Sequence, residues 1–428
     1  MRLTVAASVG AKVCSVACTL AQVPVALHAL GTEAYGLWIT LMSVIVMLNF
    51  VDFGLGVGMQ RAMATAFGRD DAAQLRRAFC SGALALAGLG LAAAVVGVPV
   101  ALLGDWAAIL RVRDPALQSE VGIALAVTLA AAAAGLPFNA APRLAAAAQR
   151  GWLQAGWSAI GSAASLGAVV LAARAHWGFV PFLALTAFLP AAQGAGLTIH
   201  LWRTLGWRWR EAALLPRADW RSLVGESLLF AVPQAGLAFL QAVPLLALSV
   251  AAGPAAVTSF NLLQRLYSPL TQGQILHLTP LWPAMTEAQA RGDRDWVRRA
   301  FGETLLVALG CGLGLAVVTA QSETLLRWWV GGAAAAPAAT VAWLTCAWFV
   351  LQVAWQPSMY LLVGVGRLAT LAWWGGLGPG LSLLGMLAGV LLHGGAAGVL
   401  LGGIAGLAAG GLPGLVRASW LVVKPDAP

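Results

Sequence analysis

Apolar stretches of about 20 residues recur along the whole chain, and short segments rich in charge, proline or glycine separate them. This is the length of apolar sequence that crosses a bilayer as an α-helix. The pattern therefore predicts an all-α polytopic membrane protein. We place its twelve spans at about 5–27, 36–58, 79–103, 119–138, 152–173, 178–200, 223–251, 255–282, 302–321, 338–363, 368–391 and 396–416.

Composition excludes a soluble globular protein. The chain is 60% hydrophobic and 10% charged, with a mean hydropathy of +0.83, whereas a soluble domain carries about 25% charged residues. The five cysteines all lie within apolar segments without paired spacing, so neither disulfides nor a metal site is predicted. No nucleotide-binding glycine-rich loop is present either, and we expect no cofactor.

Basic residues cluster in alternate connections between the spans. With the N-terminus in the cytoplasm, 19 of the 25 Lys and Arg residues lie inside, and four lie outside: Arg111, Arg113, Arg174 and Arg327. Cytoplasmic loops of membrane proteins carry such an excess. Both termini are therefore predicted to be cytoplasmic. The same distribution accounts for the net charge of +9, so no nucleic-acid partner is needed.

Aromatic and small residues suggest where some spans meet lipid or each other. Trp202, Trp207 and Trp209 flank a basic connection, and Trp328 lies near a predicted outer edge, as in interfacial tryptophan belts. The last two spans are rich in glycine, which lets transmembrane helices approach closely.

One polar segment occurs twice in the chain. "AMATAFGRDDAAQLRRAF" at 62–79 and "AMTEAQARGDRDWVRRAF" at 284–301 share nine of 18 residues at an offset of 222, and this offset also pairs Gly31 with Gly253. Both copies follow the second span of a set of six. We predict two six-helix bundles, 1–205 and 223–428, joined by a basic cytoplasmic linker at 206–222. Such parallel repeats are related by a pseudo-two-fold axis along the membrane normal, with the substrate site between them.

Polar residues line one face of the first and the seventh spans. In the first span, Lys12, Thr19 and Gln22 share a narrow helical face. In the seventh span, Gln234 and Gln241 fall seven residues apart, and the offset of 222 matches them to Lys12 and Thr19. Corresponding helices of the two halves thus carry corresponding polar stripes.

The eighth span is the most polar. Asn261, Gln264 and Arg265 cluster on one side of it, and Arg265 lies about 15 Å deep, ten residues after Ala255. Intramembrane charges are costly and mark functional sites by default. We predict a central cavity lined by the two stripes and this cluster, with Lys12 and Arg265 suited to a phosphate or diphosphate. Hydrogen bonding between helices is the alternative role for the glutamines.

Acidic residues near the cytoplasmic span ends are candidates for a gate or for ion coupling. Asp52 and Glu226 are the two, with Arg61 close to the first in sequence. Local pairing with Arg61 or Arg221 is the alternative for these carboxylates.

Three stretches resemble a known family. "LGTEAYGLW", "DFGLGVGMQRAMATAFGRDD" and "TPLWPAMTEAQARGDRDWVRRAF" are similar to the polysaccharide-transporter (O-antigen flippase) branch of the MOP flippase superfamily, most densely over 30–80 and 223–304. The resemblance implies two six-helix lobes around a cavity lined by helices one, two, seven and eight. It implies a transporter in the bacterial plasma membrane that flips polyprenyl-diphosphate-linked oligosaccharides to the outer leaflet by alternating access. Membrane lipids, the glycan substrate and polysaccharide assembly enzymes are its implied partners, and Lys12 and Arg265 are the matching cations.

Two other functions remain open. A drug or small-solute antiporter shares the six-plus-six plan. A membrane enzyme, such as a glycan polymerase or a transferase, would carry histidines or paired carboxylates on sizeable loops. The five histidines here are scattered, and the outer loops are short.

Overall fold

The protein is built from helices. The computed structural model describes residues 2–50, 55–208, 236, 239–332 and 337–423, and within these ranges it contains no strand. The chain divides into two compact units, Met1–Ala231 and Val232–Pro428, called the first and second units below. Most of the predicted linker falls in 209–235, outside the described residues, so the predicted domain boundaries stay a prediction.

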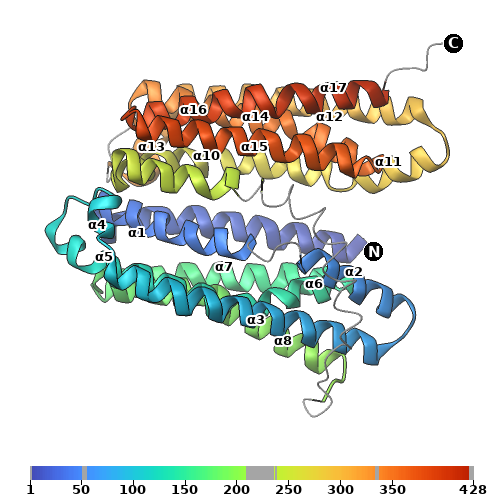
Figure 1. Ribbon diagram of the computed structural model, residues 1–428, viewed down its shortest axis with the longest axis horizontal. Helices are drawn as coiled ribbons and strands as arrows, with labels where there is room; N and C mark the ends of the chain where they lie inside the picture. The colour runs from blue at the N-terminus through green and yellow to red at the C-terminus, as the bar shows by residue number, and fades with distance from the viewer. Residues whose placement is uncertain (1, 51–54, 209–235, 237–238, 333–336, 424–428) are drawn as a thin grey trace. The chain divides into compact units, whose positions relative to one another are not determined.

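The first unit is drawn in blue to green in Figure 1. Its helices are α1 (Arg2–Phe50), α2 (Leu55–Gly68), α3 (Ala72–Leu103), α4 (Trp106–Ile109), α5 (Pro115–Gly135), the 3-10 helix η1 (Leu136–Asn139), α6 (Ala140–Ala147), α7 (Gly151–Arg174) and α8 (Phe179–Thr204). Within this unit α1 packs along α7, and α5 packs against α3 and α8.

The second unit repeats this plan, in green to red in Figure 1. Its helices are Phe239–Ala252, α10 (Pro254–Leu278), α11 (Leu281–Ala290), α12 (Arg294–Ala320), α13 (Ser322–Val330), α14 (Ala339–Gly364), α15 (Leu368–Leu391), α16 (Gly395–Gly410) and α17 (Leu412–Val423). Here α14 contacts α10, α12 and α16, and α15 packs along α16.

The helices confirm a multi-pass membrane protein. Among the described residues, nine helices are long and apolar enough to cross a membrane. The first of these, Gly10–Asn49, is two spans joined at Gly31, and Phe239–Ala252 and α10 complete a set of twelve. Several helices extend beyond the predicted spans. The span placed at 119–138 continues as helix to Ala147, so Arg143 lies in a helix, and the helices of the spans placed at 79–103 and 302–321 begin earlier, at Ala72 and Arg294.

Gly31 and Gly253 break their helices in the same way. Gly31 has φ 79° and ψ 172°, and Gly253 has φ 85° and ψ 171°. A side chain disfavours this left-handed region, because Cβ crowds the backbone there. Each glycine therefore marks a sharp corner between two consecutive spans. In the first unit, the helix between the spans placed at 5–27 and 36–58 is interrupted at Gly31.

The duplicated polar segment forms the same turn in both units. Asp70 (φ 54°) and Gly292 (φ 75°) take the left-handed position. The next residue caps the following helix: Asp71 accepts a hydrogen bond from the Gln74 N–H at 2.8 Å, and Asp293 accepts one from the Trp296 N–H at 3.0 Å. These N-caps satisfy amides that the first turn of a helix leaves unpaired.

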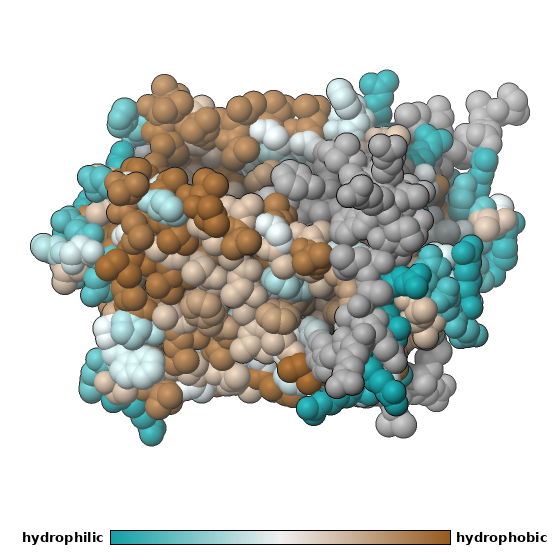
Figure 2. All heavy atoms as spheres, turned by 60° about the horizontal axis from the view of Figure 1, so that its bottom comes forward, coloured by the Kyte–Doolittle hydropathy of each residue, from teal (hydrophilic) through white to brown (hydrophobic). Residues whose placement is uncertain are grey.

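The offset of 222 also holds on the surfaces of α3 and α12. Leu84, Leu91 and Val95 of α3 are 54%, 65% and 63% exposed, and their counterparts Leu306, Leu313 and Val317 of α12 are 69%, 62% and 64% exposed. Large apolar side chains exposed along one helix face fit contact with lipid. Figure 2 shows such a surface: apolar side chains cover much of the face in view, and hydrophilic ones gather toward its ends.

The later helices repeat at an offset of 217. α7 and α15 begin and end at matching positions, and each is preceded by an arginine, Arg150 or Arg367. Their closing turns match as well, with His176 at φ 51° and His393 at φ 55°. Over the described residues the two units therefore repeat the same helices, and the offset falls from 222 to 217 between Val95 and Arg150 of the first unit.

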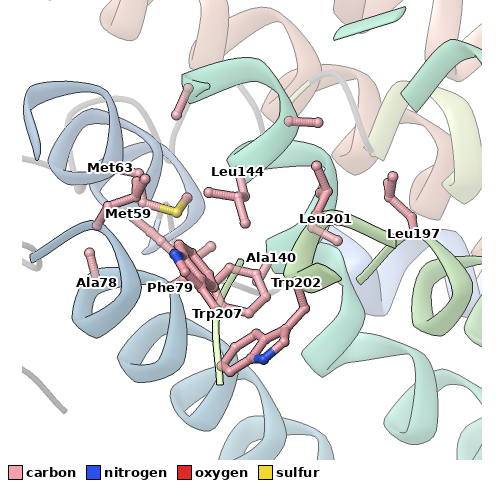
Figure 3. Close-up of a cluster of buried hydrophobic side chains, with 14 of the residues drawn as sticks. Met59, Met63, Ala78, Phe79, Ala140, Leu144, Leu197, Leu201, Trp202 and Trp207 are labelled. Carbon is pink, nitrogen blue, oxygen red and sulfur yellow. The ribbon is translucent and has the colours of Figure 1, made fainter. Parts of the chain in front are cut away.

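A hydrophobic core closes the first unit around the duplicated turn. Met59 and Met63 of α2 lie with Phe79 of α3 close to Trp202 and Trp207 (Figure 3). The two tryptophan rings meet edge to face at 5.1 Å, and they are only 3% and 8% exposed. The prediction that these two tryptophans form an interfacial belt was therefore wrong, because the end of α8 folds them into the core. Trp328 is 85% exposed, as expected, and Trp209 lies outside the described residues.

Glycines allow α15 and α16 to pack backbone against backbone. A Cβ at Gly385 would lie 2.0 Å from the carbonyl oxygen of Gly402, and a Cβ at Gly389 would lie 2.4 Å from that of Gly398. Such distances are impossible for real side chains, so this contact requires glycine. The close packing predicted from the glycine-rich last pair is confirmed.

Candidate functional site

The polar face of α1 holds three of the predicted site residues. Thr19 Oγ1 donates to the Ser15 carbonyl oxygen at 2.8 Å, and Gln22 Oε1 accepts from Ser165 Oγ of α7 at 3.4 Å. Lys12 is exposed and makes no hydrogen bond or ion pair with the residues that the structure describes. Thr19 and Gln22 thus have partners within the unit, while the Lys12 ammonium keeps all three of its donors for another group.

The polar face of α10 holds the second set. Asn261 is 3% exposed, and its Nδ2 donates to Gln264 Oε1 at 3.2 Å. One turn on, Ser268 Oγ donates to the Arg265 carbonyl oxygen at 2.9 Å. The amide group of Gln264 is therefore held by its neighbour, and its NH₂ group remains a donor close to Arg265 in the sequence.

Arg265 is the residue of this set whose buried donor lacks a partner among the described residues. Its Nε is buried and has no hydrogen-bond partner, and no carboxylate of the described ranges forms an ion pair with its guanidinium. Burying a charged donor without a partner is costly. A guanidinium also matches phosphate oxygens with a planar, two-pronged set of donors. The local structure of Arg265 therefore favours an anionic ligand.

The remaining predicted residues are placed only in part. Gln241 lies on the helix Phe239–Ala252 with an exposed side chain, and Arg61 lies exposed on α2. Asp52, Glu226 and Gln234 lie outside the described residues. The Lys12 set belongs to the first unit and the Arg265 set to the second. That the two sets face one cavity, and that the acidic pair acts as a gate, stay predictions.

Sequence reasoning missed a polar cluster in the first unit. The Arg143 guanidinium of α6 occupies the space where a side chain at Gly56 would lie, since a Cβ there would be 1.1 Å from Arg143 Nη1. One turn earlier, Asn139 Nδ2 donates to Asn49 Oδ1 of α1 at 2.9 Å. The apolar stretch that continues through "AAPRLAAAA" was the signal that Arg143 is helical. No pattern in the chain pairs it with Gly56.

Glu33 is a second residue without a predicted role. It follows the corner at Gly31, and its Oε1 accepts hydrogen bonds from the backbone N–H groups of Arg113 and Asp114. The acidic residue of "LGTEAYG" thus fixes the connection between α4 and α5. Over the described part of the chain, no three His, Cys, Asp or Glu side chains lie together as a metal site would require.

Solved structures share this fold. An inward-facing multidrug resistance MATE family transporter of the MOP superfamily superimposes with a TM-score of 0.69 at 16% identity, over 96% of both chains. Lipid II flippase MurJ, in an inward closed conformation, matches with a TM-score of 0.73 at 10% identity, over 98% of this chain and 87% of its own. A MOP superfamily transporter from Pyrococcus furiosus gives 0.62 at 16% identity, over 99% and 96%.

Sequence comparison adds no closer relationship. No family model matches the chain, and no curated protein matches it. At identities of 10–16%, the structural likeness establishes that the chain has the fold of MOP superfamily transporters. The branch of that superfamily, the substrate and the coupling remain open to proposal.

Proposed function

We propose that the protein is a membrane flippase that moves a polyprenyl-diphosphate-linked oligosaccharide from the cytoplasmic to the outer leaflet by alternating access. The observation that carries this proposal is Arg265, a guanidinium near the middle of α10 with no partner for its buried Nε among the described residues. The fold shared with MurJ supports it, because that protein is named a lipid II flippase.

The diphosphate is the part of the substrate that such a site would recognise. Lys12 of α1 and Arg265 of α10 each offer donors that no described carboxylate occupies. Two cations from two units would bind the two phosphate groups together, provided that the units close around one cavity. Thr19, Gln22, Gln241, Asn261 and Gln264 would line it, and Gln234 completes the set by sequence.

Orientation and location belong to the same proposal. The excess of basic residues in alternate connections supports cytoplasmic termini, and the membrane would be a bacterial inner membrane. Asp52, Arg61 and Glu226 would act as a gate or couple transport to an ion. The partners would be membrane lipids, the glycan substrate and the enzymes that assemble the polysaccharide, and the protein itself would be no enzyme.

An antiporter of drugs or small solutes is the competing function. The similarity to multidrug resistance MATE family transporters favours it. A site for cationic drugs would need acidic or aromatic walls, whereas the charged residues that we place on the polar faces of α1 and α10, Lys12 and Arg265, are both cations. Uptake of a soluble cation by proteoliposomes, without movement of lipid-linked glycan, would establish the antiporter in place of the flippase.

Deletion of the gene tests the proposal directly. Loss of a flippase should leave lipid-linked oligosaccharide in the cytoplasmic leaflet and remove the glycan from the cell surface. The leaflet is measured by accessibility of the glycan to an impermeant lectin in right-side-out and inverted vesicles. Normal surface display in the deletion strain, together with an unchanged pool of lipid-linked glycan, would refute the function.

A further inference from the structure

A groove opens within the first unit where α1 and α7 run side by side (Figure 1). Its volume is about 780 Å³, within the range typical of small-molecule sites. It is lined by Pro24, Val25, His28, Ala29, Val170, Ala173, Arg174 and His176. It lies beyond the hydrogen bond between Gln22 and Ser165, on the side toward the C-terminal end of α7.

The ionisable residues that line the groove are all basic. His28 comes from α1, Arg174 is the last residue of α7, and His176 lies in the turn that follows. All three side chains are exposed, and Arg174 makes no ion pair or hydrogen bond with the residues that the structure describes. The rest of the wall consists of proline, valine and alanine. The groove therefore combines an apolar wall with a rim of one arginine and two histidines.

His28 is held so that one ring nitrogen stays available. Its Nδ1 lies 2.7 Å from the Pro24 carbonyl oxygen, which can only accept, so Nδ1 carries the proton. This bond fixes the tautomer and leaves Nε2 for another group.

The second unit shows that the turn itself does not require these charges. By the offset of 217, His176 corresponds to His393 and Arg174 to Leu391, and both histidines take the left-handed position after their helix. By the offset of 222, His28 corresponds to Val250. Basic residues at a helix C-terminus often serve only the helix dipole. Here the matching turn forms without the arginine and without the first histidine.

We propose that this groove binds the phosphate group of a lipid. The phosphate would contact Arg174, His28 and His176, and the hydrocarbon would lie along Val25 and Val170. Phosphate oxygens match a guanidinium, and the apolar wall distinguishes a lipid from a free phosphate ion. In the orientation proposed above, the groove belongs to the outer leaflet. The binding itself does not depend on the flippase function, so the two proposals can fail separately.

Binding of short-chain phosphatidic acid to the purified full-length protein in uncharged detergent tests this site. We expect the variant with His28→Gln, Arg174→Gln and His176→Gln to bind it at least about tenfold more weakly, since a charge-assisted contact is lost. Arg174→Lys, which keeps the charge but loses the planar pair of donors, should bind more weakly than the parent and more tightly than the triple variant. Arg327→Gln, which removes an exposed arginine of α13 in the second unit, is the matched control and should leave binding unchanged.

Two further ligands test whether the groove recognises a lipid phosphate or a free phosphate ion. Diacylglycerol of the same chain length lacks the phosphate and should bind weakly, and inorganic phosphate lacks the hydrocarbon and should also bind weakly. Equal binding of phosphatidic acid by the parent and the triple variant would overturn the proposal. If inorganic phosphate binds as tightly as phosphatidic acid, the groove is a site for a free anion and the proposal of a lipid is overturned. If the triple variant does not fold, Arg174→Gln alone supplies the same comparison.

Discussion

Arg265 carries its charge in the interior of α10, and its buried Nε lacks a partner in the part of the chain that the structure describes. We expect Arg265→Ala to lower the rate of glycan translocation about tenfold or more, because a hydrogen bond to a charged group contributes about 1.5–3 kcal/mol. Arg265→Lys should recover part of the rate, since it keeps the charge without the planar set of donors. The measurement is the initial rate in proteoliposomes, normalised to inserted protein.

Arg327 provides the control for that experiment. It lies exposed on α13 and pairs with Glu323 on the same helix, so Arg327→Ala should leave the rate within about twofold, as surface ion pairs contribute little. An Arg265→Ala protein that inserts normally and transports at the parental rate would remove Arg265 from the substrate site.

Gly31 is a residue whose role is conformational. No atom lies within 4 Å of the position that a Cβ would take, so a substitution meets no clash, yet its φ of +79° disfavours any side chain. We expect Gly31→Ala to destabilise the protein by about 1–2 kcal/mol. Gly310→Ala is the matched control, because Gly310 has equal space in the regular helix α12. Thermal unfolding in detergent compares the two, and equal melting temperatures would contradict a strained corner at Gly31.

At the scale of helices, the two copies of the duplicated turn should respond alike. Asp71 and Asp293 cap α3 and α12 through bonds of 2.8 and 3.0 Å. Each Asp→Ala change is expected to cost about 0.5–2 kcal/mol, and Asp→Asn to cost less, because Asn also caps helices. Hydrogen exchange in the first turns of α3 and α12 reports the loss. Faster exchange in only one of the two turns would show that the copies differ in their local stability.

The contact between α15 and α16 depends on glycine at each crossing point. A Cβ at Gly402 would lie 2.0 Å from the Gly385 carbonyl oxygen, so the helices must separate if Gly402 becomes leucine. We expect Gly402→Leu to lower the melting temperature strongly or to prevent folding. Gly380→Leu, on α15 but with open space at its Cβ, should be tolerated. Equal stability of the two variants would mean that α15 and α16 do not meet at these glycines.

For the whole molecule, repetition and hydropathy were readable from the chain, whereas contacts between distant residues were not. The offset of 222 predicted that Gly31 and Gly253 correspond, and their backbone angles agree within a few degrees. The second offset of 217 was missed, since few residues match there besides Arg150 and Arg367. Local composition placed Trp202 at the lipid surface, but packing against Phe79 and Trp207 buries it.

In the candidate site, too, the helix faces were readable from the sequence, whereas the contacts between distant residues were not. Helical periodicity placed Lys12, Thr19 and Gln22 on one face of α1, but nothing local pairs Gln22 with Ser165, 143 residues away. Arg143 falls between the spans placed at 119–138 and 152–173, and its contact with Gly56 depends on how α6 packs against α2. Partners of polar residues follow from tertiary packing, which a single sequence does not encode in a readable pattern.

The orientation of the two units is the prediction that belongs to the whole molecule. If both copies have the same orientation, Arg69 and Arg291, at the two duplicated turns, should both face the cytoplasm, and Trp177 and Trp328 should both face outside. The five cysteines are free thiols, so each of these residues is changed to cysteine in a cysteine-free background.

An impermeant maleimide applied to intact cells should then label the cysteines at 177 and 328, and those at 69 and 291 only after permeabilisation. Reaction at 69 and 291 in intact cells would reverse the orientation and place the basic connections outside. Reaction at 69 but not at 291 would show that the copies are inverted with respect to each other. In that case the pseudo-two-fold axis would lie in the membrane plane.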